Sequence, residues 1–250
     1  MKLFYAEFIK LKNTFALWLT LLGALFIPLI LFGTYISDVK AFVPGKGISP
    51  WDDFLVRTLN GCCFFSIGFV LLIIGLIIQI EHKANAWKHL FSLPISRGLI
   101  YMGKLMVILT MVLVFFAFYL SFSVASGVAL GYVIPDFGFL QFPIPTLHLF
   151  RFVTEFFISI LPTVFLQYWL SFRIKSLIIS LGIGLGGLMI GLLLKSWEHI
   201  VYLPYAAPFQ MLNYKEGSPA NFQNLYLLNA VYTILFLSLS YKYFTKRFRG

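Results

Sequence analysis

The stretch from Thr58 to Lys104 reads TLNGCCFFSIGFVLLIIGLIIQI followed by EHKANAWKHLFSLPISRGLIYMGK, and it sets the architecture of the chain. Its first 23 residues carry no charge, whereas residues 81–104 are basic and contain a tryptophan. A second uncharged stretch, 31 residues long, runs from Leu105 to Pro135. A helix needs about 20 apolar residues to cross a hydrocarbon core of about 30 Å. Each uncharged stretch can therefore span a bilayer, and the segment between them is where the protein meets something outside the membrane.

The composition is that of an integral membrane protein. Hydrophobic residues make up 60% of the 250 residues and charged residues only 11%, against about 25% charged in soluble proteins. Only helices and closed barrels satisfy every backbone group in lipid, and the apolar runs lack the strict alternation of barrel strands. We therefore predict an all-α membrane protein with a single transmembrane domain over residues 1–250. Its six predicted spans cover about residues 15–37, 58–80, 105–133, 152–172, 176–194 and 222–241.

The basic residues predict the orientation of these spans. With a cytoplasmic N terminus, 13 of the 19 lysine and arginine residues fall on the cytoplasmic side and 6 on the outer side, in agreement with the positive-inside rule. The only acidic residues on the cytoplasmic side are then Glu7 and Glu81. We predict that both termini are cytoplasmic, and that the net charge of +10 reflects topology and no nucleic-acid partner.

An amphipathic pattern occupies residues 1–14, ahead of the first span. On a helical wheel Phe4, Phe8 and Leu11 share one face, whereas Glu7 and Lys10 lie largely opposite. This distribution suits a helix in the cytoplasmic membrane interface, and a plain polar lead-in is the alternative.

Aromatic residues also mark two outer segments. Trp51, in the loop before the second span, is expected at the outer interface. Residues 195–221 combine aromatic residues with prolines, which predicts short pieces at or dipping into the outer interface; an ordinary aromatic loop is the alternative.

The sequence contains no recognisable catalytic constellation. Residues 98–105 match a phosphate-binding loop until the last position, where leucine replaces the serine or threonine that holds magnesium. The histidines lack metal-binding spacing, and the adjacent Cys62 and Cys63 suit packing. We therefore predict no catalytic, cofactor or metal residue in this chain. Glu155, four residues after Arg151, is predicted to form an outer ion pair, with a proton relay as the alternative.

The segment between spans two and three has a short amphipathic pattern of its own. Trp87, Leu90 and Phe91 fall at i, i+3 and i+4, and Pro94 disfavours continuation, which predicts a helix of two or three turns. A helix that merely rests on lipid headgroups is the alternative.

An acid at the C-terminal end of a helix, as Glu81 is here, faces the unfavourable end of the helix dipole. We expect it to have a specific cationic partner, with Lys83, Lys88 and Arg97 as the candidates in this chain, and a partner protein as another.

This layout resembles the permease subunits of type-two ABC exporters, particularly the lantibiotic (bacteriocin) immunity group. The resemblance rests on the amphipathic N-terminal helix, the six spans and the acid that ends span two. It also rests on short motifs, which are Asn85, Trp87-Lys88, Leu93-Pro94, Tyr101 to Lys104 and Tyr202 to Pro208.

The resemblance implies a permease in the bacterial cytoplasmic membrane that pairs with a second permease, like or unlike itself. ATP and magnesium would bind to separate ATPase subunits, and residues 81–104 would form the coupling segment that docks on them. The implied ATPase-coupling residues are Glu81, Asn85, Trp87, Lys88, Leu90, Phe91 and Pro94.

In the immunity group the cargo is a membrane-active peptide such as a lantibiotic, and this is the cargo that the resemblance implies. Permeases of the same architecture also handle drugs, lipids or polysaccharides. A membrane anchor or receptor component that recruits a cytoplasmic partner other than an ATPase is the alternative from another class.

Overall fold

The computed structural model describes residues 2–11, 14–45, 47–194, 197–212 and 219–246. Throughout these residues the regular structure is helical. The elements are α1 Lys2–Leu11, α2 Phe15–Ser37, α3 Val39–Phe42, α4 Pro50–Lys83, α5 Trp87–Ser92, α6 Arg97–Val133, η1 Pro135–Phe137, η2 Phe139–Gln141, α7 Thr146–Arg173, α8 Leu177–Leu193, η3 Glu198–Tyr202, η4 Pro204–Ala206, α9 Ala207–Leu212 and α10 Pro219–Lys246.

Five of the described helices are long and apolar enough to cross a membrane, namely α2, α4, α6, α7 and α10. The chain is therefore a multi-pass membrane protein. The remaining predicted span, residues 176–194, corresponds to α8, which has 17 residues and is shorter than these five. The count of six spans stays a prediction, as does the placement of α1 in the membrane interface.

Two of the long helices begin eight residues before the apolar stretches that predicted them. Helix α4 begins at Pro50, after Ser49, whose hydroxyl accepts a hydrogen bond from the backbone N–H of Trp51 at 3.3 Å. Helix α6 begins at Arg97, and the Ser96 hydroxyl accepts from the N–H of Leu99 at 3.4 Å. Serine caps and a proline in the first turn are ordinary helix-start signals. They extend both helices beyond the apolar stretches.

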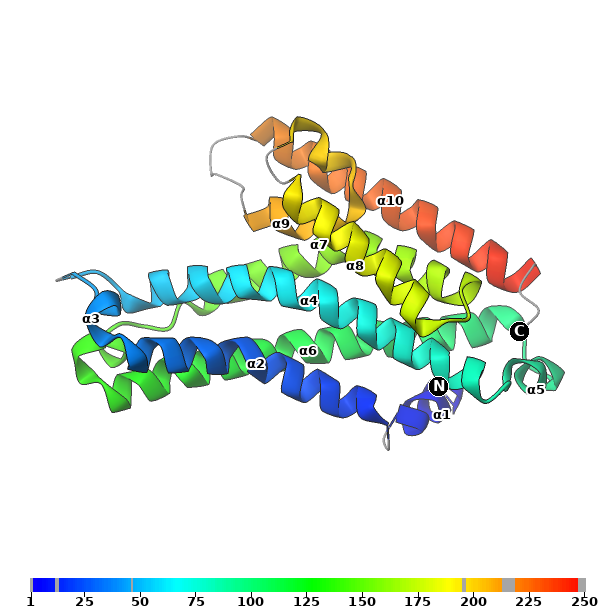
Figure 1. The fold of residues 1–250 in the computed structure, drawn as a ribbon, viewed down its shortest axis with the longest axis horizontal. Coiled ribbons are helices and arrows are strands. Elements are labelled where there is room, and N and C mark those ends of the chain that lie inside the picture. Colours follow the sequence, from blue (N-terminus) through cyan, green and yellow to red (C-terminus); the bar gives the residue numbers. More distant parts are fainter. Residues whose placement is uncertain (1, 12–13, 46, 195–196, 213–218, 247–250) are drawn as a thin grey trace.

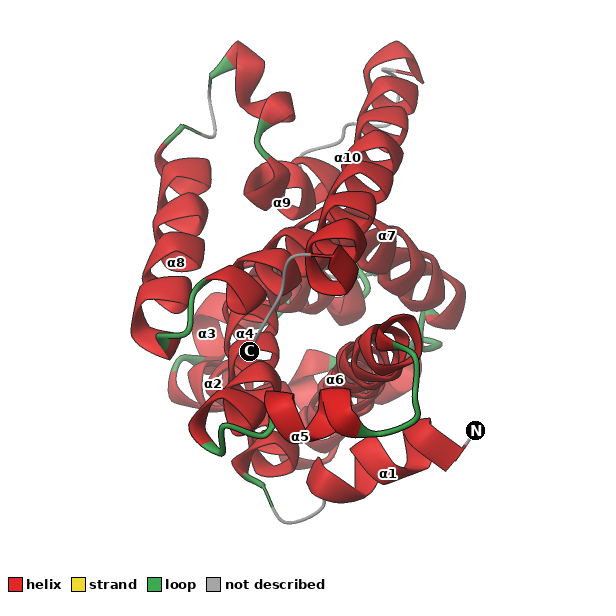
Figure 2. Ribbon diagram, turned by 90° about the vertical axis from the view of Figure 1, so that its right-hand side faces the viewer, coloured by secondary structure: helices red, strands yellow, loops and turns green. Residues whose placement is uncertain are grey.

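The long helices lie side by side, and the short ones lie at the two ends of the bundle (Figure 1). Helix α2 packs against α4 and α6, and α7 packs against α10. Helices α1 and α5 lie at the same end as the last turn of α10, whereas α3 lies at the opposite end. Figure 2 looks at the bundle from the first of these ends and shows α1 running below α6, which is seen nearly end-on and which α1 contacts. The two short segments at this end are thus placed to touch several long helices at once.

The opposite end contains an aromatic cluster that corrects the expectation for Trp51. The indole of Trp51 is buried, its Nε1 donates to the carbonyl of Phe139 at 3.1 Å, and its ring meets those of Phe54 and Phe139 edge to face. The ring also lies so close to Gly127 of α6 that a Cβ there would stand 2.6 Å from it. Trp51 therefore packs inside the protein and does not face the membrane interface.

Candidate functional site

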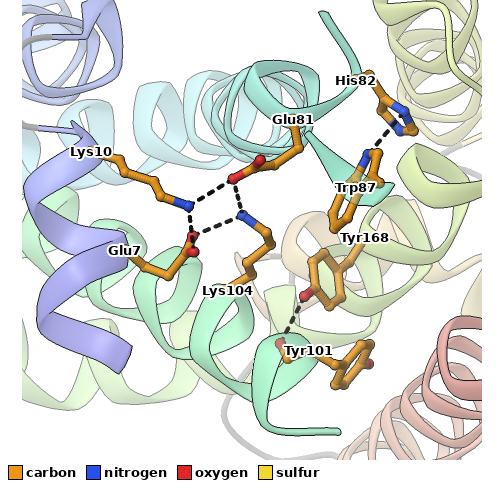
Figure 3. A network of polar contacts seen from close by, with 8 residues as sticks. All are labelled: Glu7, Lys10, Glu81, His82, Trp87, Tyr101, Lys104 and Tyr168. Atoms are coloured by element: carbon orange, nitrogen blue, oxygen red, sulfur yellow. Dashed lines mark hydrogen bonds and ion pairs between the residues drawn. The ribbon is translucent and has the colours of Figure 1, made fainter. Parts of the chain in front are cut away.

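Four charged side chains from three helices meet at the end of the bundle that carries α1 and α5 (Figure 3). They are Glu7 and Lys10 of α1, Glu81 of α4 and Lys104 of α6, and we call them the ion cluster. Lys104 Nζ lies 2.8 Å from Glu7 Oε2 and 2.9 Å from Glu81 Oε1. Lys10 Nζ lies 2.8 Å from Glu7 Oε1 and 3.0 Å from Glu81 Oε1. Each lysine thus donates to both carboxylates.

The ion cluster is largely buried, so its charges depend on one another for stabilisation. Lys104 is 1% exposed and Glu81 is 3% exposed, and charges buried to this degree persist only when they are paired. Lys10 is more accessible. Burial by itself lowers the pKa of Lys10, but its hydrogen bonds and the charges of Glu7 and Glu81 together raise that pKa above its ordinary value. The four ion pairs therefore fix α1 to the ends of α4 and α6.

The ion cluster corrects two expectations from the sequence. The partner of Glu81 is neither Lys83, Lys88 nor Arg97, because the described contacts of its carboxylate are with Lys104 and Lys10. On α1 the buried stripe includes Glu7 together with Leu11, so Glu7 does not lie on an outward polar face. A helical wheel groups residues by polarity alone. An acid can nevertheless lie on the buried face when a cation of another helix, here Lys104, lies close to it.

A sharp turn at Asn85 directs the chain from α4 into α5. Asn85 has φ +48, a left-handed backbone conformation, and asparagine is among the residues that adopt it most readily. Around it, the N–H of Ala86 donates to the carbonyl of Glu81 at 3.0 Å. The turn places Asn85 on the surface and sends the next aromatic residue, Trp87, back into the protein.

Trp87 is the anchor of α5. It is 2% exposed, and its ring meets Phe172 of α7 and Phe244 of α10 edge to face at 5.8 Å each. The ammonium of Lys104 lies 5.4 Å from the centre of the same ring, within the range of a cation–π contact. Trp87 therefore joins α5 to the ion cluster on one side and to α7 and α10 on the other.

A histidine connects Trp87 to α7. Trp87 Nε1 donates to His82 Nδ1 at 3.2 Å (Figure 3). His82 Nε2 lies 3.2 Å from the carbonyl of Ser171. An indole N–H is a donor only, so His82 Nδ1 must accept, and the neutral ring then carries its proton on Nε2. His82 thereby donates to the carbonyl of Ser171. These two hydrogen bonds link α5 to α4 and α4 to α7. A protonated His82 could not accept from Trp87.

The ends of α6, α7 and α10 are tied together next to this chain of contacts. The hydroxyl of Tyr168 donates to the carbonyl of Tyr101 at 2.9 Å, and Tyr101 packs against Phe244 of α10 with ring centres 5.7 Å apart. The guanidinium of Arg97 reaches the carbonyl of Thr245 at 3.4 Å. Five long or terminal helices, α1, α4, α6, α7 and α10, are thus joined around α5.

The remaining residues predicted for coupling lie at or near the surface of α5. Lys88 and Pro94 are exposed, as is Asn85, whereas Leu90 and Phe91 are half-buried. The seven residues predicted for coupling thus form three sets. Glu81 and Trp87 are buried, Leu90 and Phe91 pack partly against the core, and Asn85, Lys88 and Pro94 face outward.

The structure also places the predicted outer ion pair and the segment that resembles a phosphate-binding loop. Arg151 Nε lies 2.8 Å from Glu155 Oε1 on α7, in an i,i+4 pair whose arginine is exposed. Residues 98–105, which resemble a phosphate-binding loop, are part of helix α6, and their lysine, Lys104, belongs to the ion cluster.

Sequence reasoning missed Lys104, Glu7, Lys10 and His82 as members of the site. One available signal was the position of Lys104, three residues after Tyr101 and four after Ile100, which are both buried. A lysine on the inward stripe of an otherwise apolar helix indicates an acidic partner inside the protein. Glu7 and Glu81 were the only acids predicted to lie on the same side of the membrane as Lys104.

Comparison with known families identifies the class of protein. The family model described as ABC-2 family transporter protein matches residues 3–191. The chain belongs to this family, and it is a transmembrane permease of the ABC-2 type. Permeases of this family are membrane components that work with an ABC ATPase. No curated protein and no solved structure shows a match to the chain, and the resemblance to the lantibiotic-immunity group stays a prediction.

Proposed function

We propose that this permease is the membrane half of an ATP-driven exporter, and that α5 transmits the movement of a separate ATPase subunit to the spans. The protein would lie in a bacterial cytoplasmic membrane with both termini in the cytoplasm. ATP and magnesium would be bound by the ATPase subunit.

The observation that carries this proposal is the burial of Trp87 in α5, a short helix whose Lys88, His89 and Ser92 are exposed. A helix that merely rests on lipid would turn its aromatic residues outward. Here Trp87 is inserted among Lys104, Phe172 and Phe244, which belong to three different long helices. A force applied to α5 is therefore transmitted to α6, α7 and α10 through contacts that are already packed.

The ATPase would contact the outer face of α5 and the turn after it. Lys88, His89, Ser92, Leu93 and Pro94 are exposed there. Glu81 and Trp87 would not touch the partner; they would hold α5 rigid against the permease. Substitution of the exposed residues should therefore weaken binding of the ATPase. Substitution of Glu81 or Trp87 should instead uncouple ATP hydrolysis from transport.

Co-purification tests the first half of the proposal. Tagged permease is expressed with its neighbouring genes, extracted in a mild detergent and examined for a bound subunit that hydrolyses ATP. Lys88→Glu should reduce the recovered ATPase severalfold, whereas Lys40→Glu, an exposed lysine on the predicted outer side, should leave recovery unchanged. Recovery of a partner without ATPase activity would instead support the membrane anchor.

The proposal for the inner residues is tested in the assembled complex. Trp87→Phe should leave the ATPase bound while it lowers cargo-dependent transport relative to ATP hydrolysis, because the hydrogen bond to His82 is lost and the shape is largely kept. Equal transport per ATP in this variant and the parent would show that Trp87 does not transmit the movement.

We further propose that the permease works as one of two and that its cargo is a membrane-active peptide or another amphipathic molecule. An apolar groove of about 180 Å³ supports the cargo class. It lies between α2, α4 and α8 and is lined partly by Phe64, Phe65 and Phe69. Its lining would suit the apolar side of a molecule that enters from the bilayer.

Cells that produce the permease with its ATPase should tolerate higher concentrations of a lantibiotic than cells that carry an ATP-hydrolysis-deficient ATPase. Drugs, lipids and polysaccharide precursors serve as the comparison cargoes. Protection against one of these and none against the peptide would reassign the cargo and leave the exporter mechanism standing.

A further inference from the structure

Three basic side chains line a cavity between the ends of α7 and α10, and they have no role in the proposed coupling. The cavity measures about 380 Å³ and is lined by Trp169, Arg173, Leu239, Lys242, Tyr243 and Lys246. None of these six residues is acidic. Its volume falls in the range of about 300–1,000 Å³ that is usual for small-molecule sites.

The three cations of this cavity are not neutralised by the described parts of the protein. No carboxylate among the described residues lies within ion-pair distance of Arg173, Lys242 or Lys246. Two helices end here, and each helix C terminus contributes roughly half a negative charge. Against three formal positive charges this leaves roughly two that need an external anion.

The arginine of the cavity is held in a defined position. Its guanidinium carbon lies 5.2 Å from the ring centre of Trp169 and 5.8 Å from that of Tyr243. Two aromatic contacts fix the plane of the guanidinium, and a fixed guanidinium binds phosphate oxygens through paired N–H donors. The indole N–H of Trp169 is buried and has no hydrogen-bond partner in the described structure, so it is a further donor that lacks an acceptor.

The same cavity also has an apolar side. Leu239 and the ring of Trp169 line it, and both belong to helices long and apolar enough to cross the membrane. A ligand that carries a phosphate on an apolar body satisfies both sides, whereas a free phosphate ion satisfies only the cations. Basic pockets between membrane helices on the cytoplasmic side are known settings for anionic lipid headgroups.

We propose that this cavity binds the phosphate headgroup of an anionic phospholipid from the cytoplasmic leaflet, with Arg173 and Lys242 as its principal ligands. The lipid would bridge the ends of α7 and α10 beside Phe172 and Phe244, the residues against which Trp87 packs. Bound lipid would therefore brace the same two helices that hold α5. The proposal does not depend on the identity of the cargo.

Native mass spectrometry and thermal unfolding of the full-length purified protein test this proposal. The probes are dioleoyl phosphatidylglycerol, dioleoyl phosphatidylcholine and inorganic phosphate, each added to delipidated protein in mild detergent. The anionic lipid should be retained and should raise the melting temperature, with little effect from the zwitterionic lipid. Each removed charge should weaken binding about five-fold, so Arg173→Gln with Lys242→Gln should weaken it on the order of 25-fold.

Lys83→Gln is the matched control, because Lys83 is an exposed basic residue at the same end of the bundle and does not line the cavity. It should bind phosphatidylglycerol as the parent does. Equal binding of the two lipids, or undiminished binding by the double variant, would overturn the proposal. So would an equal effect of inorganic phosphate, which would make the ligand a free ion. Loss of ATPase recovery in a double variant that still binds lipid would assign the cations to the partner protein instead.

Discussion

Lys104 on α6 donates to Glu7 on α1 across 2.8 Å, although the two residues stand 97 positions apart in the chain. This bond attaches the N-terminal helix to the beginning of a 37-residue helix that is long and apolar enough to span the membrane. Because Glu81 of α4 receives a hydrogen bond from the same ammonium group, one lysine holds three helices together.

Replacement of Lys104 by methionine should strongly destabilise the protein. The substitution keeps most of the side-chain volume but leaves Glu7 and Glu81 with only Lys10 as a described ionic partner. Removal of one partner from a buried ion pair typically costs about 3–5 kcal/mol. The melting temperature in detergent measures the effect. Lys88→Met, at an exposed lysine, should stay within about 0.5 kcal/mol of the parent, and similar melting temperatures for the two variants would contradict the role of the ion cluster.

A double-mutant cycle between Glu7 and Lys104 should show that α1 is fastened by charge. The variants are Glu7→Gln, Lys104→Gln and the two together, each assayed for thermal stability. Residues in one ion network typically couple by about 0.5–3 kcal/mol, so the double variant should be less destabilised than the sum of the single ones. The exposed Lys88→Gln, combined with Glu7→Gln, provides the comparison cycle. Additive effects in both cycles would mean that α1 is held by packing alone.

The contacts of Trp87 can be separated by two substitutions. Trp87→Ala should destabilise the protein by about 3–5 kcal/mol, since it opens a cavity among Phe172 and Phe244. Trp87→Phe should cost about 1–3 kcal/mol, mainly through the loss of the donor to His82. Trp197→Ala, at a tryptophan that is 52% exposed, is the control and should have little effect. Thermal unfolding in detergent ranks the variants. A Trp87→Phe variant as stable as the parent would contradict the role of the hydrogen bond to His82, and an equal cost for the two Trp87 changes would contradict the role of the ring contacts.

Two glycines of α8 should respond in opposite ways to alanine. A Cβ at Gly187 would overlap the ring of Tyr205, whereas a Cβ at Gly182 meets nothing within 4 Å. Gly187→Ala should therefore lower the melting temperature and separate α8 from η4. Gly182→Ala should leave the melting temperature unchanged or raise it, because alanine is favoured over glycine in helices by about 1 kcal/mol. The same response at both positions would show that α8 does not pack on Tyr205.

Cysteine labelling on intact cells tests the predicted orientation. A membrane-impermeant maleimide should modify Lys40→Cys from outside, and should modify Lys88→Cys only after the cells are permeabilised. Both positions are exposed in the structure, and the native Cys62 and Cys63 are buried, so background labelling should be low. Labelling of Lys88→Cys on intact cells would place α5 outside and remove the proposed ATPase contact.

Much of the helical architecture follows from the sequence. The first predicted span, residues 15–37, has the same bounds as α2, because hydropathy falls sharply at both ends. The helices that contain the second and third predicted spans begin before those spans, since counting uncharged residues ignores caps. Pro50, Ser49 and Ser96 carried that information. The aromatic pattern from Trp87 to Phe91 likewise predicted a short helix, which is α5.

The partners within the site could not be read from local sequence. Candidates for the partner of Glu81 were sought nearby at Lys83, Lys88 and Arg97, but the actual partners, Lys10 and Lys104, depend on how α1, α4 and α6 pack. Periodicity shows which face of a helix is apolar and gives no distance between faces of different helices. The burial of Trp87 has the same origin, because the turn at Asn85 decides which way α5 faces.

The ion cluster contains two carboxylates and two ammonium groups, so its formal charges cancel. A displacement of one elementary charge across the full membrane is worth about 2.3 kcal/mol for every 100 mV of potential. Because the cluster is neutral as a unit, it can shift along the bilayer normal with α1, α4 and α6 without electrical work. Movement of the ion cluster therefore adds no voltage dependence of its own to a conformational cycle that displaces the ends of α1, α4 and α6.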